Sequence, residues 1–498
     1  MSSRTRRRLG WFALMAGGLS AAVLTGCQRQ LAVPDLGGIY ERAAQHPFPD
    51  RNPVIVIPGI LGSRLVHEPD GQTVWGAFTP AAANPRQADE LRKLALPMQP
   101  GATLAELTDE TRTDGALDRI EIEFAKIPIK LDAYANILGT LGAGGYRDAQ
   151  LGRAGAIDYG DDHYSCFQFP YDWRRDNVEN ARLLKAYIEE KRIEVQTKHA
   201  ERFGGEPDDY DVRFDIVAHS MGGLITRYML RYGDAEPPEV FPDGTVAEPE
   251  VTWAGAEHVA KAILVGTPNA GSVASLRQLY QGAQFAPIFP SYPPALLGTM
   301  PSVYQLLPRG RHGAVLDTPE ADGSRRQLDP LDITFWQKRQ WGLADPKQDR
   351  VLQMLLPEIE SATERRIVAL DHLSKSLARA KAFHAALDAP ADLPDGLEMF
   401  LFAGDAQPTE AVVETDRQAG TLRPISHGPG DGTVLRSSAV LDERVGNEES
   451  ADWSPRLRTP IDWTHVTFLH HDHLGLTSST TFSDNVLYML LEMPTGDE

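Results

Sequence analysis

FDIVAHSMGG occupies residues 214–223 and is the most informative segment of the chain. Its first five residues form an apolar run rich in β-branched side chains, which is typical of a strand buried on both faces of a parallel sheet. Leu224 to Leu230 continues as a helix, so Ser220 lies on a strand–turn–helix corner that points its hydroxyl outward. Backbone packing requires small residues two positions before and after this serine, and Ala218 and Gly222 meet that requirement. The segment predicts a nucleophilic serine, and a helix start capped by Ser220 is the alternative interpretation.

Other segments of the same kind surround this corner. Apolar runs at 53–57, 262–265 and 399–403 predict further buried strands, and residues 177–200 predict a helix. Strands that alternate with helices indicate the α/β class, with a mostly parallel central sheet flanked by helices. Together with the serine corner, this pattern predicts an α/β-hydrolase fold over residues 53–498.

Two long stretches interrupt the alternation and are predicted to be insertions. They cover about 64–165 and about 273–393, and inserted segments over the edge of such a sheet often form caps, lids and substrate pockets. The second contains the apolar and proline-rich segment Phe285–Leu297. The many prolines of its first part, Phe285–Pro294, disfavour a helix or a central strand, so an irregular surface segment is expected there. An exposed apolar lid would suit an aggregated lipid substrate, whereas a simply packed insertion would have the same composition.

The corner also predicts a site that stabilises an oxyanion. The backbone N–H of Met221 begins the helix and can face the charge that develops on a substrate oxygen. A second N–H is expected from the loop after an earlier strand, and Ile60, which follows Pro58-Gly59, is suitably placed. An apolar side chain at Ile60 is no obstacle because the main chain is the donor.

Serine catalysis requires an acid and a histidine later in the chain. Asp431, in the turn Gly430–Val434, and Asp405, after the strand at 399–403, are both candidate acids. The candidate bases lie in His470–His473; we favour His473 because a helix-like stretch follows it at 485–491, and His471 is next. Histidines packed this closely rarely form one tetrahedral metal site, so we expect neither a metal nor another cofactor.

The N-terminus predicts export. Arg4, Arg6, Arg7 and Arg8 precede a short apolar run, Leu9–Leu24, and then Leu-Thr-Gly-Cys27. This arrangement is typical of a secretory signal, and the run is shorter than the roughly 20 residues that a membrane-spanning helix needs. The motif at Cys27 resembles the lipobox of bacterial lipoproteins, in which the signal is removed and the cysteine is lipidated. The expectation is a signal peptide at 1–26, a polar, proline-interrupted tether at 27–52 and a protein anchored in the cell envelope. Gln28 is compatible with sorting to the outer membrane. The alternatives are an uncleaved signal anchor and a lone cysteine in an ordinary secretory signal.

Charge and cysteine content narrow the remaining possibilities. The formal charge of −20 argues against nucleic acid as a partner and against electrostatic docking on anionic lipid. If Cys27 carries a lipid, Cys166 has no cysteine left to pair with, and we interpret it as a buried structural thiol. Asp172 and Arg174 are interpreted as a structural ion pair beside a packed aromatic residue.

Several motifs, taken in order, resemble the lecithin:cholesterol acyltransferase family, which includes phospholipase A-type and bacterial members. The resemblance implies the triad Ser220, Asp431 and His473, favours Asp431 over Asp405, and implies oxyanion donors at Ile60 and Met221. It also implies a small membrane-contacting or cap subdomain at about 64–165 and an inserted cap or lid at about 273–393. Residues 310–395 match the family only loosely, and this chain cannot form the disulfides of the vertebrate members. The matching pieces are 53–65, 169–174, 218–223, 266–272, 304–308, 430–434 and 473–476.

The expected reaction is transfer of an acyl group from an ester, of a lipid by preference, through an acyl-enzyme to water or to an alcohol. Two alternatives remain open. One is an esterase that acts on a soluble or polymeric ester. The other is a surface lipoprotein that keeps the fold but binds without catalysis.

Overall fold

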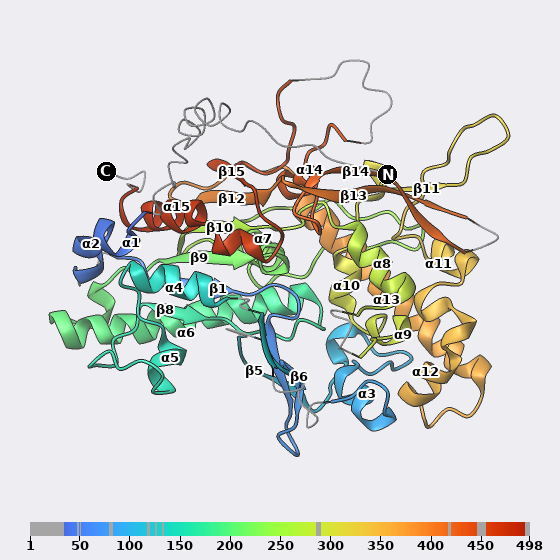
Figure 1. The fold of residues 1–498 in the computed structure, drawn as a ribbon, viewed down its shortest axis with the longest axis horizontal. Coiled ribbons are helices and arrows are strands. Elements are labelled where there is room, and N and C mark those ends of the chain that lie inside the picture. The colour runs from blue at the N-terminus through green and yellow to red at the C-terminus, as the bar shows by residue number, and fades with distance from the viewer. Residues whose placement is uncertain are drawn as a thin grey trace, which may run out of the picture. The chain divides into compact units, whose positions relative to one another are not determined.

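A parallel sheet forms the centre of the fold. The computed structural model describes residues 34–46, 49, 51–78, 83–116, 120–124, 127–131, 134–284, 290–416, 420–445 and 455–493. Within these residues the largest sheet has six strands in the order β15-β12-β10-β9-β1-β8, each parallel to its neighbours (Figure 1). Their bounds are β1 Val54–Ile57, β8 Cys166–Gln168, β9 Phe214–His219, β10 Val259–Val265, β12 Glu398–Gly404 and β15 His465–Leu469. The predicted strands at 53–57, 214–218, 262–265 and 399–403 are confirmed.

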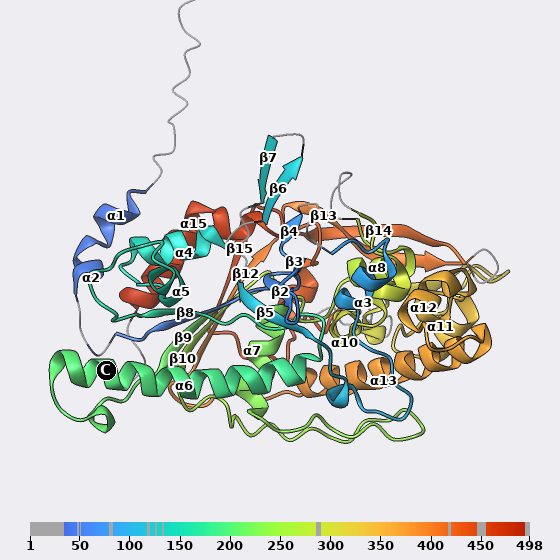
Figure 2. The same ribbon diagram turned by 90° about the horizontal axis from the view of Figure 1, so that it is seen from below.

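Helices cover both faces of this sheet because alternate strand residues point to opposite sides. Ile55 and Ile216 belong to one buried cluster with residues of α6 (Asn177–Phe203) and α7 (Met221–Tyr232). Val56 and Val217 belong to the other, with residues of α4 (Ala135–Ala143) and α15 (Thr480–Leu491). Figure 2 shows α4 and α15 on one side of the strands and α6 on the other. The predicted fold class, a mostly parallel sheet flanked by helices, is therefore confirmed.

The stretch between β1 and β8 holds two small sheets and several short helices. One sheet has the order β3-β2-β5 and the other β4-β6-β7. The bounds are β2 Ser63–His67, β3 Thr73–Trp75, β4 Ala77–Phe78, β5 Thr111–Ala116, β6 Ile120–Phe124, β7 Ile127–Leu131, α3 Ala88–Leu94, η1 Leu104–Glu106 and α5 Ala149–Arg153. Figure 2 shows β6 and β7 projecting away from the rest of the fold.

The stretch between β10 and β12 is largely helical. Its elements are α8 Val273–Gln281, α9 Pro294–Leu297, α10 Pro301–Gln305, η3 Gly310–His312, β11 Val315–Asp317, α11 Ile333–Arg339, η4 Gly342–Ala344, η5 Pro346–Gln348, α12 Asp349–Leu355 and α13 Ala362–Asp388. Phe285–Phe289, the first part of the expected apolar lid, lies outside the described residues. The residue at which the predicted irregular segment ends, Pro294, is the first residue of α9, where a proline fits without loss of a hydrogen bond.

A fourth sheet, β11-β13-β14, joins β11 from before β12 to two strands that follow β12 in the chain. Its later strands are β13 Gln407–Thr415 and β14 Leu422–Gly430, which pair antiparallel, and α14 Arg436–Val440 comes next. The short helices η2 Pro207–Asp209 and η6 Gly475–Ser478 complete the described elements.

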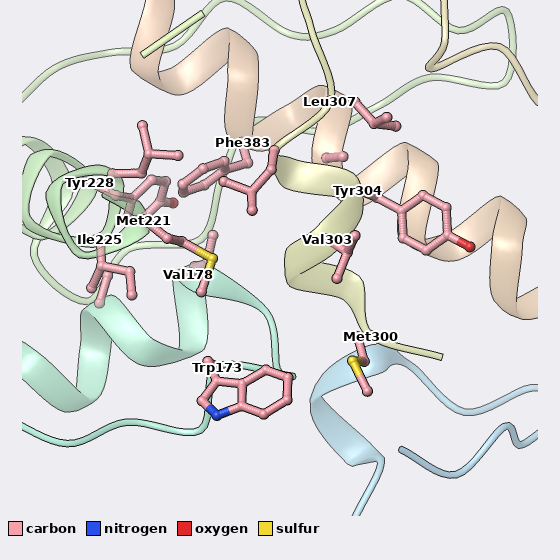
Figure 3. Close-up of a cluster of buried hydrophobic side chains, with 14 of the residues drawn as sticks. Trp173, Val178, Met221, Ile225, Tyr228, Met300, Val303, Tyr304, Leu307 and Phe383 are labelled. Atoms are coloured by element: carbon pink, nitrogen blue, oxygen red, sulfur yellow. The ribbon is translucent and has the colours of Figure 1, made fainter. Parts of the chain in front are cut away.

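The helical stretch packs against α7 through a continuous apolar cluster (Figure 3). Tyr228 of α7 stacks on Phe383 of α13, with ring centroids 5.5 Å apart, and Val303 of α10 belongs to the same cluster. Met221, the residue after Ser220, is fully buried there. The helix that follows the serine is therefore fixed by the inserted helices as well as by the sheet.

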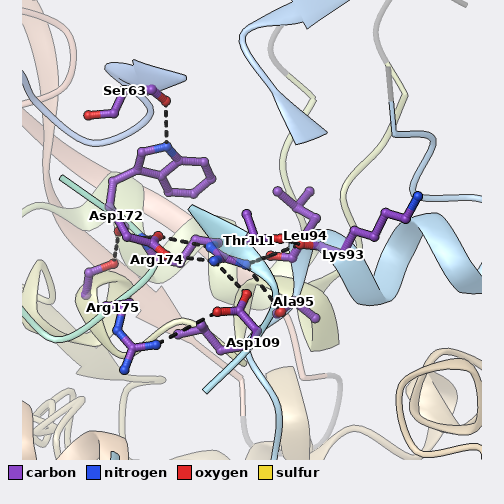
Figure 4. Close-up of polar contacts among 12 residues, drawn as sticks. Ser63, Lys93, Leu94, Ala95, Asp109, Thr111, Asp172, Arg174 and Arg175 are labelled. Atoms are coloured by element: carbon purple, nitrogen blue, oxygen red, sulfur yellow. Dashed lines mark hydrogen bonds and ion pairs between the residues drawn. The ribbon is translucent and has the colours of Figure 1, made fainter. Parts of the chain in front are cut away.

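A buried ion-pair network joins the first stretch to the loop after β8 (Figure 4). Arg174, fully buried, donates two hydrogen bonds to Asp172, pairs with Asp109 at 2.7 Å and reaches main-chain carbonyls at the end of α3. The Trp173 indole donates to the carbonyl of Ser63. Every partner is structural, so the prediction of a structural Asp–Arg pair is confirmed.

The folded unit starts within the segment that was predicted to be a tether. The chain divides after Asp35, and Leu36–Glu498 forms one unit. Within residues 36–52, α1 (Leu36–Ile39) and α2 (Glu41–Gln45) flank Tyr40, whose buried hydroxyl donates to Asp484 at 2.9 Å. The tether interpretation is therefore wrong for this part, because one aromatic anchor outweighs the polar composition around it. No helix of the described residues is long and apolar enough to cross a membrane.

Candidate active site

The corner after β9 holds Ser220 in a strained conformation. Ser220 has a φ of 53°, in the left-handed region that residues other than glycine seldom adopt, and α7 begins at the next residue. A β-carbon at Gly222 would lie 2.5 Å from the carbonyl oxygen of Pro58, which explains why this position must be small. The Ser220 side chain makes no capping hydrogen bond, so the alternative of a simple helix cap is wrong.

Ser220, His473 and Asp431 form one hydrogen-bonded row. The Ser220 hydroxyl lies 2.9 Å from His473 Nε2, and His473 Nδ1 lies 2.8 Å from Asp431 Oδ2. Because a carboxylate only accepts, His473 carries its hydrogen on Nδ1, and Nε2 is left to accept from the serine. The geometry brings together the three residues that the sequence analysis selected.

Asp431 is prepared to remain a carboxylate. It lies in the turn between β14 and α14, and its Oδ1 accepts hydrogen bonds from the N–H groups of Thr433 and Val434 at 2.9 and 2.7 Å. Burial alone would raise the pKa of Asp431, but His473 and these two donors outweigh it and lower the pKa below its usual value. A second contact, from the His473 N–H to the Asp431 carbonyl at 3.0 Å, ties the two loops together.

The rival residues lie apart from this row. Asp405 pairs with Arg436 at 3.4 Å and with His470 at 3.7 Å. Neither Asp405 nor His471 has a hydrogen bond to Ser220 or His473 among the described residues.

The candidate oxyanion donors border the serine on both sides. Met221 is the first residue of α7, so its N–H has no partner within the helix. A β-carbon at Gly59 would lie 2.8 Å from Ser220 Cβ, which brings the loop that carries Ile60 directly against the nucleophile. The Gly59 N–H donates to the Tyr134 hydroxyl at 2.7 Å, so of the two loop N–H groups that of Ile60 is the one left for a substrate.

Aromatic residues from both long stretches support this loop. The Trp75 indole donates to the Leu61 carbonyl at 2.7 Å and lies edge-on to Trp173 and Tyr292, with centroids 5.4 and 5.8 Å away. Tyr292 comes from the second stretch and Trp75 from the first, so both stretches meet beside the loop after β1.

Sequence reasoning missed two residues next to the row. His219 and Tyr134 are buried, and both contact groups that hold Ser220 and His473 in place. His219 belongs to the FDIVAHSMGG segment, but Tyr134 lies far away in the chain in an unremarked stretch, so no spacing linked the two.

The other predicted site residues have separate surroundings. Cys166 is buried, its thiol donates to Asp148 over 3.6 Å, and burial followed by the charge of Asp148 raises its pKa well above the usual value. The interpretation of a structural thiol is confirmed. Cys27, the predicted lipidation site, lies outside the described residues. Within the described part of the chain, no three acidic, histidine or cysteine side chains are grouped to hold a metal ion.

The parallel sheet, the strained serine between β9 and α7 and the histidine–acid pair after later strands define an α/β-hydrolase fold. Residues 155–341, which contain the serine corner, match the family model described as lecithin:cholesterol acyltransferase. The resemblance inferred from the motifs is thereby confirmed. The match supports an enzyme of the acyl-ester hydrolase or acyltransferase type.

Solved structures agree with this fold. A chain of the Tle4–Tli4 complex has a TM-score of 0.54 at 15% identity, over 89% of this chain and 98% of that one. EstA from Clostridium botulinum has a TM-score of 0.30 at 12% identity, over 90% and 88% of the two chains. The fold comparison rests on the first. No curated protein sequence matches the chain.

Proposed function

We propose that the protein is a serine-dependent acyl-ester hydrolase or O-acyltransferase that acts on lipids. The observation that carries the proposal is the row Ser220–His473–Asp431, with contacts of 2.9 and 2.8 Å. A hydroxyl hydrogen-bonded to a neutral imidazole, whose other nitrogen is fixed by a carboxylate, is the arrangement that activates a serine for attack on a carbonyl.

The reaction follows from these positions. His473 Nε2 removes the Ser220 proton as Oγ bonds to the ester carbonyl carbon, and the N–H groups of Ile60 and Met221 donate to the oxyanion. The tetrahedral intermediate collapses, the C–O bond of the leaving alcohol breaks, and His473 returns the proton to that alcohol. Water or a second alcohol then attacks the acyl-enzyme by the same steps in reverse, which releases an acid or a new ester.

Apolar surroundings favour a lipid over a soluble ester. Ile60 and Leu61 are partly exposed beside the serine, and Leu474, the residue after His473, has 48% of its surface exposed. An apolar rim around a serine nucleophile suits acyl chains presented at an interface.

The experiment is labelling of the purified protein with a fluorophosphonate probe, with and without phosphatidylcholine liposomes, together with release of fatty acid from those liposomes. We expect the wild type to be labelled and active, and Ser220→Ala and His473→Ala to lose both properties. Ser376→Ala is the matched control, because its buried hydroxyl has no partner in the described structure, and it should behave like the wild type. A folded wild type that neither labels nor hydrolyses, with or without liposomes, would support the non-catalytic alternative. Activity only on soluble esters would support the esterase.

We also propose that the chain is exported and held at a membrane of the cell envelope by a lipid on Cys27. The support is the sequence Leu-Thr-Gly-Cys27 after a basic head and a short apolar run. Membrane fractionation of cells that express the full chain, with mass spectrometry of its N-terminus, tests this. We expect Cys27→Ser to lose membrane attachment, and an unmodified Cys27 in membrane-bound wild type would contradict the anchor.

A further inference from the structure

We propose that Tyr134 and His219 are positioning residues that couple the oxyanion loop to the catalytic histidine. This inference rests on the proposed function and names residues that the triad does not include. The Gly59 N–H donates to the Tyr134 hydroxyl at 2.7 Å, that hydroxyl lies 3.3 Å from His219 Nδ1, and His219 Nε2 lies 3.1 Å from the carbonyl oxygen of His473.

The groups at the two ends, the Gly59 N–H and the His473 carbonyl, decide which atom donates in each of these three hydrogen bonds. The His473 carbonyl can only accept, so His219 must carry a hydrogen on Nε2. The Gly59 N–H can only donate, so the Tyr134 oxygen accepts it and uses its own hydrogen for His219 Nδ1. When His219 is neutral, these partners allow only the tautomer with its hydrogen on Nε2.

Burial supports the same protonation states. Burial, reinforced by the neighbouring His473, lowers the pKa of His219 to about 3. Burial also raises the pKa of Tyr134 above its usual value, so its hydroxyl keeps the proton that it donates. Tyr134 and His219 therefore keep the same protonation states, and the same hydrogen-bond directions, at neutral pH.

The hydrogen bonds of Tyr134 and His219 connect two parts of the site that must keep a fixed separation. One end is the residue before Ile60, whose N–H is aimed at the oxyanion; the other is the main chain of His473, which also donates its N–H to the Asp431 carbonyl at 3.0 Å. The rings of His219 and His473 are 4.9 Å apart and tilted, so His219 also limits where the catalytic imidazole can lie. Neither Tyr134 nor His219 has a hydrogen bond to Ser220 in the described structure, so they act through the groups that they hold.

Such a role differs from ordinary core packing in what its loss would change. A displacement of about 1 Å in a reacting group costs on the order of 100-fold in rate even when the fold survives. Loss of a buried tyrosine hydroxyl that only stabilises the fold lowers thermal stability and leaves kcat unchanged. Tyr232 supplies this comparison, because its hydroxyl donates to the Ala386 carbonyl at 2.8 Å at the far end of α7.

The experiment compares Tyr134→Phe with Tyr232→Phe for kcat, KM and the rate of fluorophosphonate labelling, at a temperature where both are folded. We expect Tyr134→Phe to lower kcat by about 10- to 100-fold with KM within about two-fold of wild type. Tyr232→Phe should keep the wild-type kcat at a similar loss of thermal stability.

A second pair of variants separates the two halves of the His219 contact. His219→Gln can still donate to the His473 carbonyl from the position of Nε2, whereas His219→Asn is too short to reach it. We expect Gln to retain clearly more kcat than Asn.

Each outcome has a separate meaning. An active wild type with Tyr134→Phe at wild-type kcat overturns this inference and leaves the proposed function standing. Equal kcat for the Gln and Asn variants overturns the coupling through the His473 carbonyl. A wild type no more active than Ser220→Ala overturns the proposed function, and this inference with it.

Discussion

Buried polar side chains lie at both ends of strands β9 and β10, but they differ in how far they are enclosed. At their start, Asp215 and Lys261 face each other in register, and the Lys261 ammonium donates to the carbonyls of Met489 and Met493 at the end of α15. At the end of β9, Ser220 and His473 are held by hydrogen bonds, but 15% of the His473 side chain is exposed. Lys261 is almost fully buried, and its ammonium donates its hydrogen bonds to carbonyls at the end of a helix. The difference teaches that a buried polar group becomes a candidate for chemistry when part of its side chain remains open to solvent.

The largest expected effect is at the catalytic end. Asp431→Asn should lower kcat by about 10⁴-fold, because the amide NH2 that replaces Oδ2 can only donate to Nδ1 and so permits the wrong tautomer of His473. The free energy of unfolding should change far less than kcat. Ester hydrolysis under saturating substrate measures the effect. Asp405→Asn is the matched control, and a larger loss of kcat there than at Asp431 would contradict the assigned acid.

The next effect is at the other end, on stability alone. Lys261→Met keeps the apolar stem but removes the ammonium, which leaves the helix-end carbonyls and Asp215 without their cation. We expect the free energy of unfolding to fall by about 3–5 kcal/mol, as measured by urea titration. Activity per folded molecule should stay at the wild-type value. A stable variant with impaired kcat would show that the two ends are not separate.

A smaller effect concerns the pH dependence of stability. Burial, opposed by Lys261, raises the pKa of Asp215 to about 7. The unfolded chain releases this proton near pH 4 and the folded chain near pH 7, so Asp215 makes the fold less stable as pH rises through that interval. Asp215→Asn removes this contribution. Its stability relative to wild type should therefore increase from pH 4 to pH 8, measured by urea titration at each pH; a difference that is constant with pH would argue against the raised pKa.

The smallest effect is chemical. Cys166 is buried in β8 of the same sheet and its pKa is raised, so we expect the native protein to react with a disulfide reagent far more slowly than the urea-unfolded protein. Cys27→Ser protein provides the background on which only Cys166 can react. Rapid reaction of the native form would show that the thiol is accessible and that its structural interpretation is wrong.

The sequence predicted the buried strands well because their runs are long and apolar. It missed β8 and β15: β8 has three residues, and β15 is an edge strand in which only Leu469 is fully buried. Neither carries the continuous apolar run that identifies a central strand. The fold class did not depend on them, since four of the strands and the serine corner were recognised.

Within the site, prediction depended on how local the signal was. Ser220 could be found from its neighbours alone, and His473 was ranked above His471 by the helix-like stretch that follows it. Asp431 needed the family resemblance to rank it above Asp405. Tyr134 could not be found, because its contact with Gly59 arises only when the first long stretch folds back over the loop after β1. The helices α1 and α2 were missed for a related reason, since Tyr40 is stabilised by Asp484 near the other end of the chain.

The tightness of the serine corner has a consequence for how this protein can change over time. A β-carbon at Gly222 would meet the Pro58 carbonyl, and one at Gly223 would meet the hydroxyl of Thr267. Three separate segments are therefore constrained as a set, and none of them can accept a larger side chain by itself. A lineage, or an engineer, that alters Gly223 would have to alter Thr267 in the same step. New substrate preferences are easier to reach through the long stretches that surround the corner, which can vary while the corner stays fixed.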